Sequence, residues 1–193
     1  PNYYVWIRNI SNALEKLKNV SELRNAARNI DNMAVRDSLT GVYNRMGINR
    51  FVVDMVKQAN TSRRRLLFIF ADMDGLKKIN DEFGHEAGDQ AICFAAEALQ
   101  EAFCEKELII RYGGDEFLVV SDALCWEQAE EKKAQITALL KQWQRDEKLP
   151  YRLSMSIGYY QKEPDTEASM EQYINWADER MYEMKCKNRE QRK

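Results

Sequence analysis

The stretch Arg111-Tyr112-Gly113-Gly114-Asp115-Glu116-Phe117 decides how this chain folds. It lies between two short apolar runs of β-branched and aromatic residues, Leu108–Ile110 and Phe117–Val120, which favour strands. Glycine supplies the positive φ angles of tight hairpin connections, so the glycine pair predicts a β-hairpin. The turn of this hairpin would present the adjacent carboxylates of Asp115 and Glu116.

These carboxylates suit a hard cation such as Mg²⁺ (or Mn²⁺), which binds carboxylate oxygens together with substrate phosphates. A third carboxylate, Asp72, follows the continuously apolar run Leu66–Ala71, which predicts a central strand covered on both faces. If that strand lies beside the hairpin, Asp72, Asp115 and Glu116 converge, and bound cations would offset their repulsion. About two ions per site are usual for in-line displacement at phosphorus. Taken alone, the turn could also be a solvated hairpin tip.

Length and composition indicate a globular protein of one domain plus an appendage, with 193 residues of which 45% are hydrophobic. The 29 basic and 31 acidic residues are interspersed, which argues against a nucleic-acid or membrane-surface partner. Four cysteines without Cys-x-x-Cys spacing favour free thiols in a reducing cytosol. Without a spanning apolar run or a signal-peptide pattern, we expect a cytoplasmic segment, which can still belong to a protein with a membrane or sensor module upstream.

The first 36 residues differ from the rest in pattern. No Pro or Gly occurs from Asn2 to Val35, and apolar residues recur every three or four positions, which predicts a long amphipathic helix. This helix could pack onto its own domain or form a parallel coiled-coil stalk. We therefore expect a connector over residues 1–36 and a separate domain over 37–193.

The remaining elements alternate between helix and strand. Helices are predicted over Arg45–Asn60, Leu76–Phe83, Asp89–Phe103, Trp126–Arg145 and Met170–Lys187, and a further strand over Tyr151–Tyr160. Strands linked by helical crossovers predict an α/β fold in which a mixed central sheet is flanked by helices. Functional groups of such folds lie at strand ends and in loops.

An ordered set of motifs carries a family resemblance. It comprises Asp37-Ser38-Leu39-Thr40-Gly41 with Asn44-Arg45, Asp72-Met73-Asp74, Lys77-Lys78-Ile79-Asn80-Asp81, Phe83-Gly84-His85, Gly88-Asp89, Gly113-Gly114-Asp115-Glu116-Phe117, Ser156-Ile157-Gly158, and Ala177-Asp178 with Tyr182 and Lys185. From about Asp37 to Arg189 the chain resembles the GGDEF family of diguanylate cyclases. The resemblance implies a sheet like that of nucleotidyl cyclases and polymerase palms, and the joining of two GTP into cyclic di-GMP with release of pyrophosphate.

The resemblance also implies roles for individual residues. Asp72, the Met73 carbonyl, Asp115 and Glu116 would serve the metals, and Asp115 or its neighbour would help to deprotonate the attacking 3′-hydroxyl. These positions make Asp72, Asp115 and Glu116 the expected catalytic residues.

Other matching positions would bind the substrate. Asn80 and Asp89 would recognise guanine, because a carboxylate that accepts from its N1 and N2 hydrogens rejects adenine. The remaining substrate-binding positions are the phosphate-cradling Gly75, Leu76 and Lys77, the turn glycines Gly113 and Gly114, and the cationic pair Lys185 and Arg189, which would reach the β and γ phosphates.

Several of these residues have simpler interpretations. Asn80 and Asp89 could be helix caps, and Lys185 and Arg189 could belong to a solvated basic helix end. His85 is the only histidine, and a role in ordering a loop fits it better than metal binding.

The chain departs from the family pattern in two places. Cys104 and Glu107 stand where many members have an Arg-x-x-Asp product-binding motif, so we expect weak or no product inhibition at this surface. Asn188 replaces a usual glycine, a mild change because Asn tolerates left-handed backbone.

Because one domain binds one GTP and the product needs two, the expected enzyme is a homodimer with GTP as substrate and cyclic di-GMP as product. A catalytically silent module that binds GTP or cyclic di-GMP as a sensor is the main alternative. A nucleic-acid polymerase is disfavoured because the chain has no basic stripe.

Overall fold

The computed structural model describes residues 3, 14–16, 18–20, 34–103 and 106–190, with the backbone alone for 187–190. By their contacts the residues group into two compact units, 1–36 and 37–193. The long helix predicted over residues 2–35 falls largely outside the described residues. Within that range, the described residues 3, 14–16, 18–20 and 34 are helical. In the part of the chain that the structure describes, no helix is long and apolar enough to cross a bilayer.

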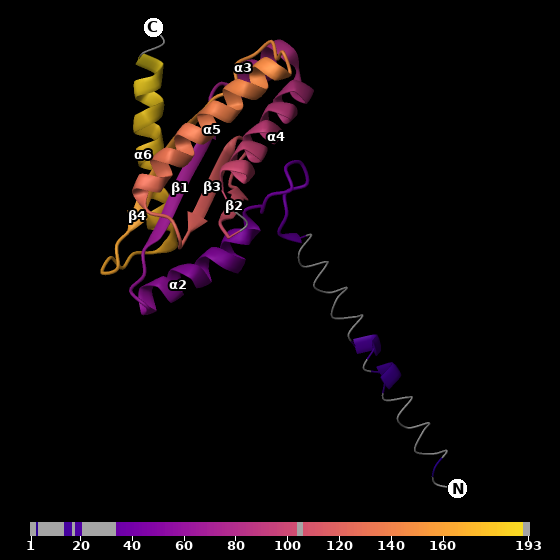
Figure 1. The fold of residues 1–193 in the computed structure, drawn as a ribbon, viewed down its shortest axis with the longest axis vertical. Coiled ribbons are helices and arrows are strands. Elements are labelled where there is room, and N and C mark those ends of the chain that lie inside the picture. The colour runs from indigo at the N-terminus through magenta and orange to yellow at the C-terminus, as the bar shows by residue number, and fades with distance from the viewer. Residues whose placement is uncertain (1–2, 4–13, 17, 21–33, 104–105, 191–193) are drawn as a thin grey trace. The chain divides into compact units, whose positions relative to one another are not determined.

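Unit 37–193 consists of one sheet and the helices that cover it (Figure 1). In chain order its elements are the π-helix η1 (Ile48–Val52), α2 (Val53–Thr61), β1 (Leu66–Met73), α3 (Leu76–Phe83), α4 (His85–Ala102), β2 (Leu108–Arg111), β3 (Glu116–Ser121), α5 (Trp126–Asp146), β4 (Met155–Lys162) and α6 (Met170–Glu190).

The strands lie in the order β2-β3-β1-β4, and every ladder between named strands is antiparallel. The mixed sheet predicted from the sequence is therefore wrong in one respect. The helical crossovers do join strands of equal direction, β1 to β2 and β3 to β4, but another strand lies between the members of each pair. Only an isolated bridge between Tyr43 and Ile110 is parallel among the described pairings.

Two hydrophobic layers enclose the sheet. Helices α3, α4 and α5 cover one face, where Ile79, Leu99 and Ile136 pack with alternate residues of β1 and β3. On the other face, η1, α2 and α6 pack against the intervening residues of the same strands, with Val52 and Tyr173 fully buried. All eight residues of β1 are buried, which confirms the central strand predicted from its apolar run.

Most predicted elements occur, with shifted ends. The helix over Leu76–Phe83 is confirmed, whereas α4 begins at His85, four positions before the predicted start. The helix predicted over Arg45–Asn60 begins at Ile48 as a π-helical turn and continues as α2. The last strand begins at Met155, because the preceding residues connect α5 to the sheet without pairing in the β1 ladder.

Candidate active site

The register of β1 and β3 brings the expected metal carboxylates together. Asp72 is paired directly with Glu116 across the two strands. The amide of Met73 donates to the carbonyl of Asp115 at 3.0 Å, which fixes the turn against the end of β1. Strand β1 thus lies beside the hairpin, as convergence of Asp72, Asp115 and Glu116 requires.

The backbone conformation of the glycine turn differs from the prediction. Neither Gly113 nor Gly114 has a positive φ, whereas Gly41, Gly75 and Gly84 do. A Cβ on Gly113 would instead collide with the carboxylate of Glu116. The Glu116 side chain folds back over Gly113, so a larger residue there would displace the end of the Glu116 side chain.

Lys185 supplies positive charge to this cluster. Its Nζ donates to Oδ1 of Asp72 at 2.5 Å, and 20% and 10% of the two side chains are exposed. The interpretation of Lys185 as a solvated helix end is therefore wrong. The side chain of Arg189, its expected companion, lies outside the described residues.

Three carboxyl groups at this site, those of Asp72, Glu116 and Asp178, have raised pKa values. Burial raises the pKa of Asp72, which the contact with Lys185 lowers only in part, and the charge of Asp115 raises it further. Burial also raises the pKa of Glu116, and the charges of Asp72, Asp115 and Asp178 add to it. The pKa of Asp178 is raised as well, chiefly by burial. This mutual repulsion indicates a site that attracts cations.

The donor set fits a magnesium-like ion in its chemistry. It consists of carboxylate oxygens, which hard cations prefer, and it crowds negative charge that a divalent ion would neutralise. No group of three or more His, Cys, Asp or Glu side chains within the described residues is arranged closely enough to hold an ion as it stands. Lys185 lies at Oδ1 of Asp72, where it would compete with an ion for that oxygen.

The loop after β1 is held in place by serines of β4 and the residues before it. Asp74 accepts from Ser154 Oγ at 2.8 Å and from Ser156 Oγ at 2.7 Å, and its amide donates to the Ser154 carbonyl at 2.8 Å. Gly75 follows with a φ of 79°, a left-handed conformation that glycine adopts without strain. Helix α3 therefore begins at Leu76 with its first amides available to an anion, as expected for a phosphate cradle.

The two predicted guanine-binding residues come from neighbouring helices. Asn80 is half-buried and its amide lies against Gly88, where a Cβ would collide with it. Asp89, the next residue of α4, is exposed beside this contact. Both residues lie inside their helices, and neither helix has a side-chain cap hydrogen bond at its start, so the capping interpretation is wrong. His85 is the exposed first residue of α4.

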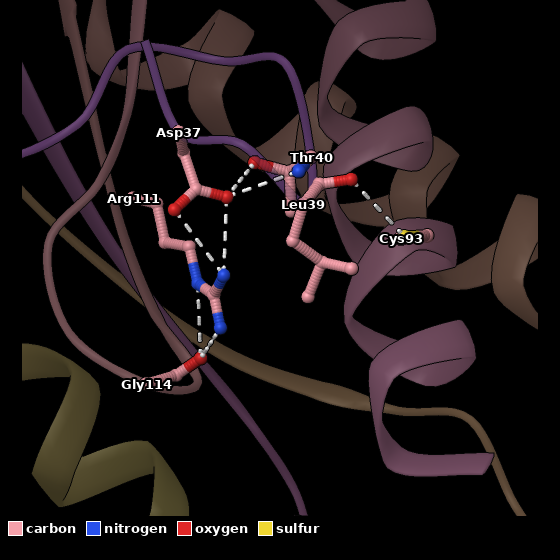
Figure 2. A network of polar contacts seen from close by, with 6 residues as sticks. All are labelled: Asp37, Leu39, Thr40, Cys93, Arg111 and Gly114. Atoms are coloured by element: carbon pink, nitrogen blue, oxygen red, sulfur yellow. Dashed lines mark hydrogen bonds and ion pairs between the residues drawn. The ribbon is translucent and has the colours of Figure 1, made fainter. Parts of the chain in front are cut away.

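Arg111 ties the hairpin to the segment that opens this unit (Figure 2). Its guanidinium contacts both carboxylate oxygens of Asp37 and the carbonyl of Gly114. Burial alone would raise the pKa of Asp37, but hydrogen bonds from Thr40 and Arg111 lower it below its usual value. The carbonyl of Leu39 also accepts from the thiol of a cysteine on α4, at 3.5 Å.

Close packing of α6 on β4 sets the position of Lys185. A Cβ on Gly158 would collide with the backbone of Arg180 and Met181. Gly158 therefore lets α6 approach the sheet, and Lys185 follows Met181 by about one helical turn.

Glu107 faces inward at the position of the usual product-binding motif. It is 8% exposed, and its Oε1 accepts from Ser121 Oγ at 3.3 Å. Cys104, the other residue of this pair, lies outside the described residues.

Comparison with known proteins identifies this arrangement. A family model described as "Diguanylate cyclase, GGDEF domain" matches residues 34–191. The chain belongs to the GGDEF family.

Three similar proteins illustrate the range of this GGDEF family. Diguanylate cyclase DgcP of Escherichia coli is 30% identical over 184 residues, which cover 91% of this chain and 52% of DgcP. Cyclic di-GMP phosphodiesterase NbdA of Pseudomonas aeruginosa is 33% identical over 103 residues, which cover 53% of this chain and 13% of NbdA. The coiled coil and GGDEF domain of DgcB from Caulobacter crescentus, solved with cyclic di-GMP, superposes with a TM-score of 0.74 over 91% of this chain and 93% of that chain, at 20% identity, and shows the shared fold.

The GGDEF domain contains site residues that the sequence analysis did not assign. Asp178 contributes negative charge near Glu116, and Asp74 with Ser154 fixes the loop after β1. The alternation Ser-x-Ser at the start of β4, opposite Asp-x-Asp at the end of β1, was the available signal. Asp178 belongs to the Ala177-Asp178 motif, but its role could not be assigned, because helix α6 must be placed before its position near the hairpin is known.

Proposed function

We propose that this GGDEF domain is a diguanylate cyclase that condenses two GTP molecules into cyclic di-GMP and two pyrophosphates. The pairing of Asp72 with Glu116 beside the Asp115 turn is the observation that carries the proposal. Family membership supports it. The chain spans 52% of DgcP and 13% of NbdA, so the activity of the whole protein is part of the proposal.

The reaction would use Mg²⁺ or Mn²⁺, about two ions per site, which activate the attacking hydroxyl and stabilise the leaving pyrophosphate. Asp72, the Met73 carbonyl, Asp115 and Glu116 would hold these ions. Asp115 or Glu116 would accept the proton of the 3′-hydroxyl as its oxygen attacks the α-phosphorus. The bond from that phosphorus to the bridging β-phosphate oxygen breaks in the same step.

Substrate binding would divide between two regions. Asn80 and Asp89 would hydrogen-bond the guanine edge, while the amides of Gly75, Leu76 and Lys77 cradle the phosphates. Lys185 and Arg189 would neutralise the departing pyrophosphate. Gly113 and Gly114 would let the substrate approach the turn closely.

One GTP fits one such site, so two domains must face each other and the enzyme would work as a homodimer. Residues 1–36 would act as the connector from an upstream module and raise the effective concentration of one domain for the other. The complex of DgcB includes a coiled coil, which agrees with this arrangement.

The decisive experiment is incubation of the protein with GTP and Mg²⁺, followed by mass spectrometry for cyclic di-GMP. We expect product from the wild type and none from Asp115→Ala. Product from the variant, or no product from a verified dimer, contradicts the proposal.

A catalytically silent sensor is the second candidate. It is favoured by the match to NbdA, which is named a phosphodiesterase. A silent module would bind GTP or cyclic di-GMP without turnover. Binding detected by calorimetry, together with no cyclic di-GMP in the mass-spectrometric assay, would therefore favour the sensor.

A further inference from the structure

The contact between Lys185 and Asp72 joins two residues to which the proposed function gives separate tasks. Asp72 would hold a metal, and Lys185 would reach the phosphates of the nucleotide. In the structure Nζ of Lys185 lies 2.5 Å from Oδ1 of Asp72 instead. Because 20% and 10% of these side chains are exposed, this charge-assisted hydrogen bond is shielded from water and is stronger than a surface ion pair.

Lys185 serves the whole acidic cluster. Its charge lowers the pKa of Asp72, of Glu116 and of Asp178, against the burial that raises all three. Three carboxyl groups thus share the field of one ammonium group. The Lys185 ammonium group thus offsets the negative charge that a divalent cation would otherwise neutralise.

We propose that Lys185 is the internal counter-ion of the metal site, and that it leaves Asp72 for the nucleotide phosphates when these arrive. The inference rests on the proposed function and concerns the regulation of the same site. A metal alone has to compete with the Lys185 ammonium for Asp72. A nucleotide offers that ammonium phosphate oxygens in exchange, so nucleotide and metal binding become positively coupled through one side chain.

The side chain and its support suit this exchange. A lysine ammonium is a compact charge on a flexible four-carbon stem, so it can change partners without moving the backbone. Helix α6 is packed closely on β4 at Gly158, which keeps the base of the side chain fixed. The exchange therefore needs only a change of the Lys185 side-chain conformation, while helix α6 stays in place.

A double-mutant cycle tests the exchange without relying on turnover. The affinity of a non-hydrolysable GTP analogue is measured by calorimetry in EDTA for the wild type, Asp72→Asn, Lys185→Gln and the double variant. Asp72→Asn frees Lys185 for the phosphates, so we expect metal-free binding to tighten about tenfold. In the Lys185→Gln background this gain should disappear.

Glu116→Gln is the matched control. It removes one negative charge from the same cluster, but Glu116 is not the hydrogen-bonding partner of Lys185. General relief of repulsion would tighten nucleotide binding equally in Asp72→Asn and Glu116→Gln. The exchange predicts a clearly larger gain in Asp72→Asn.

A second readout uses the metal alone. Binding of Mn²⁺ without nucleotide, followed by electron paramagnetic resonance, should be about tenfold tighter in Lys185→Gln than in the wild type. Lys77→Gln removes an exposed positive charge near the same loop and should change Mn²⁺ affinity much less. This readout involves only lysine variants, and Lys185→Met replaces Lys185→Gln if the latter fails to fold.

The outcomes separate the two proposals. Three results would each overturn the counter-ion role while the cyclase proposal stands. They are an equal gain in metal-free nucleotide affinity in Asp72→Asn and Glu116→Gln, a gain that persists without Lys185, and an unchanged Mn²⁺ affinity in Lys185→Gln. A wild type that binds no guanine nucleotide even with Mg²⁺ overturns both.

Discussion

Arg111 binds Asp37 and the Gly113-Gly114 turn with a single guanidinium group. Its Nη1 donates to Oδ1 and Oδ2 of Asp37 at 3.0 and 3.3 Å, while Nε and Nη2 donate to the carbonyl of Gly114 at 3.1 and 2.7 Å (Figure 2). The side chains of the pair are 16% and 19% exposed. The first residue of the unit is thereby linked to the turn that carries Asp115.

We expect Arg111→Lys to destabilise the unit by about 1 to 3 kcal/mol, because a lysine cannot reproduce this fork and leaves partly buried acceptors unpaired. Urea denaturation measures the loss. Arg65→Lys is the matched control, since Arg65 contacts Glu163 at 3.1 Å with 61% and 50% of the side chains exposed. Its loss should stay below about 0.5 kcal/mol, and equal losses in both variants would contradict the prediction.

Gly158→Ala should be severely destabilising, by about 2 to 3 kcal/mol or more, because its Cβ meets the backbone of α6 rather than a movable side chain. Thermal unfolding monitors the effect. Gly114→Ala is the control for stability, since a Cβ there meets nothing within 4 Å and the φ is not positive. Two variants of equal stability would show that α6 does not approach β4 as described.

Gly88→Ala should weaken guanine-nucleotide binding more than it weakens the fold. The added Cβ displaces the side-chain amide of Asn80, whose end is flexible enough to give way. We expect a loss of affinity similar to that of Asn80→Ala, measured by calorimetry with a GTP analogue and Mg²⁺. If Gly88→Ala binds as the wild type does, Asn80 does not recognise the base from its present position.

The raised pKa of Glu116 predicts a pH dependence of stability in metal-free buffer. A carboxyl group with a raised pKa stabilises the fold while it is protonated, and this contribution is lost as the pH rises through its folded pKa, above the usual value of 4.5. The wild type should therefore lose stability relative to Glu116→Gln as the pH rises through this window. Melting temperatures in EDTA from acid to neutral pH measure the difference, and Mn²⁺ should diminish it at neutral pH. A constant difference would count against the raised pKa.

Product inhibition through the surface around Glu107 should be weak or absent. The carboxylate of Glu107 bonds to Ser121 inside the protein and is 8% exposed, so it offers little to a ligand. Cyclic di-GMP is titrated into a pyrophosphate-release assay, in which the rate should stay constant. Micromolar inhibition that Glu107→Ala abolishes would show that this surface binds product after all.

The sequence predicted the elements well where the apolar period was unambiguous. The buried run before Asp72, the helix after Gly75 and the hairpin around the glycine pair all occur. Local patterns cannot specify which strands are neighbours, so the antiparallel order β2-β3-β1-β4 was missed. The same limit explains why a positive φ was wrongly expected at Gly113, since the turn geometry and the position of the Glu116 side chain above Gly113 depend on the pairing with β1.

Contacts between distant segments were the least predictable part of the site. The pairing of Lys185 with Asp72 spans 113 positions and depends on how α6 packs at Gly158. Family motifs identified both residues, but they assigned them to different ligands. Only the three-dimensional arrangement shows that the two side chains neutralise each other.

The pairing of Asp72 with Glu116 across β1 and β3 fixes the distance between their backbone positions. Directly opposed residues of antiparallel strands keep their Cβ atoms about 4.5 to 5.5 Å apart, whatever connects the strands elsewhere. Loops and helices can therefore change in length while the separation of these two Cβ atoms is kept. The hydrogen bonds of the β1–β3 ladder thus fix the backbone spacing of two expected metal ligands independently of the rest of the chain.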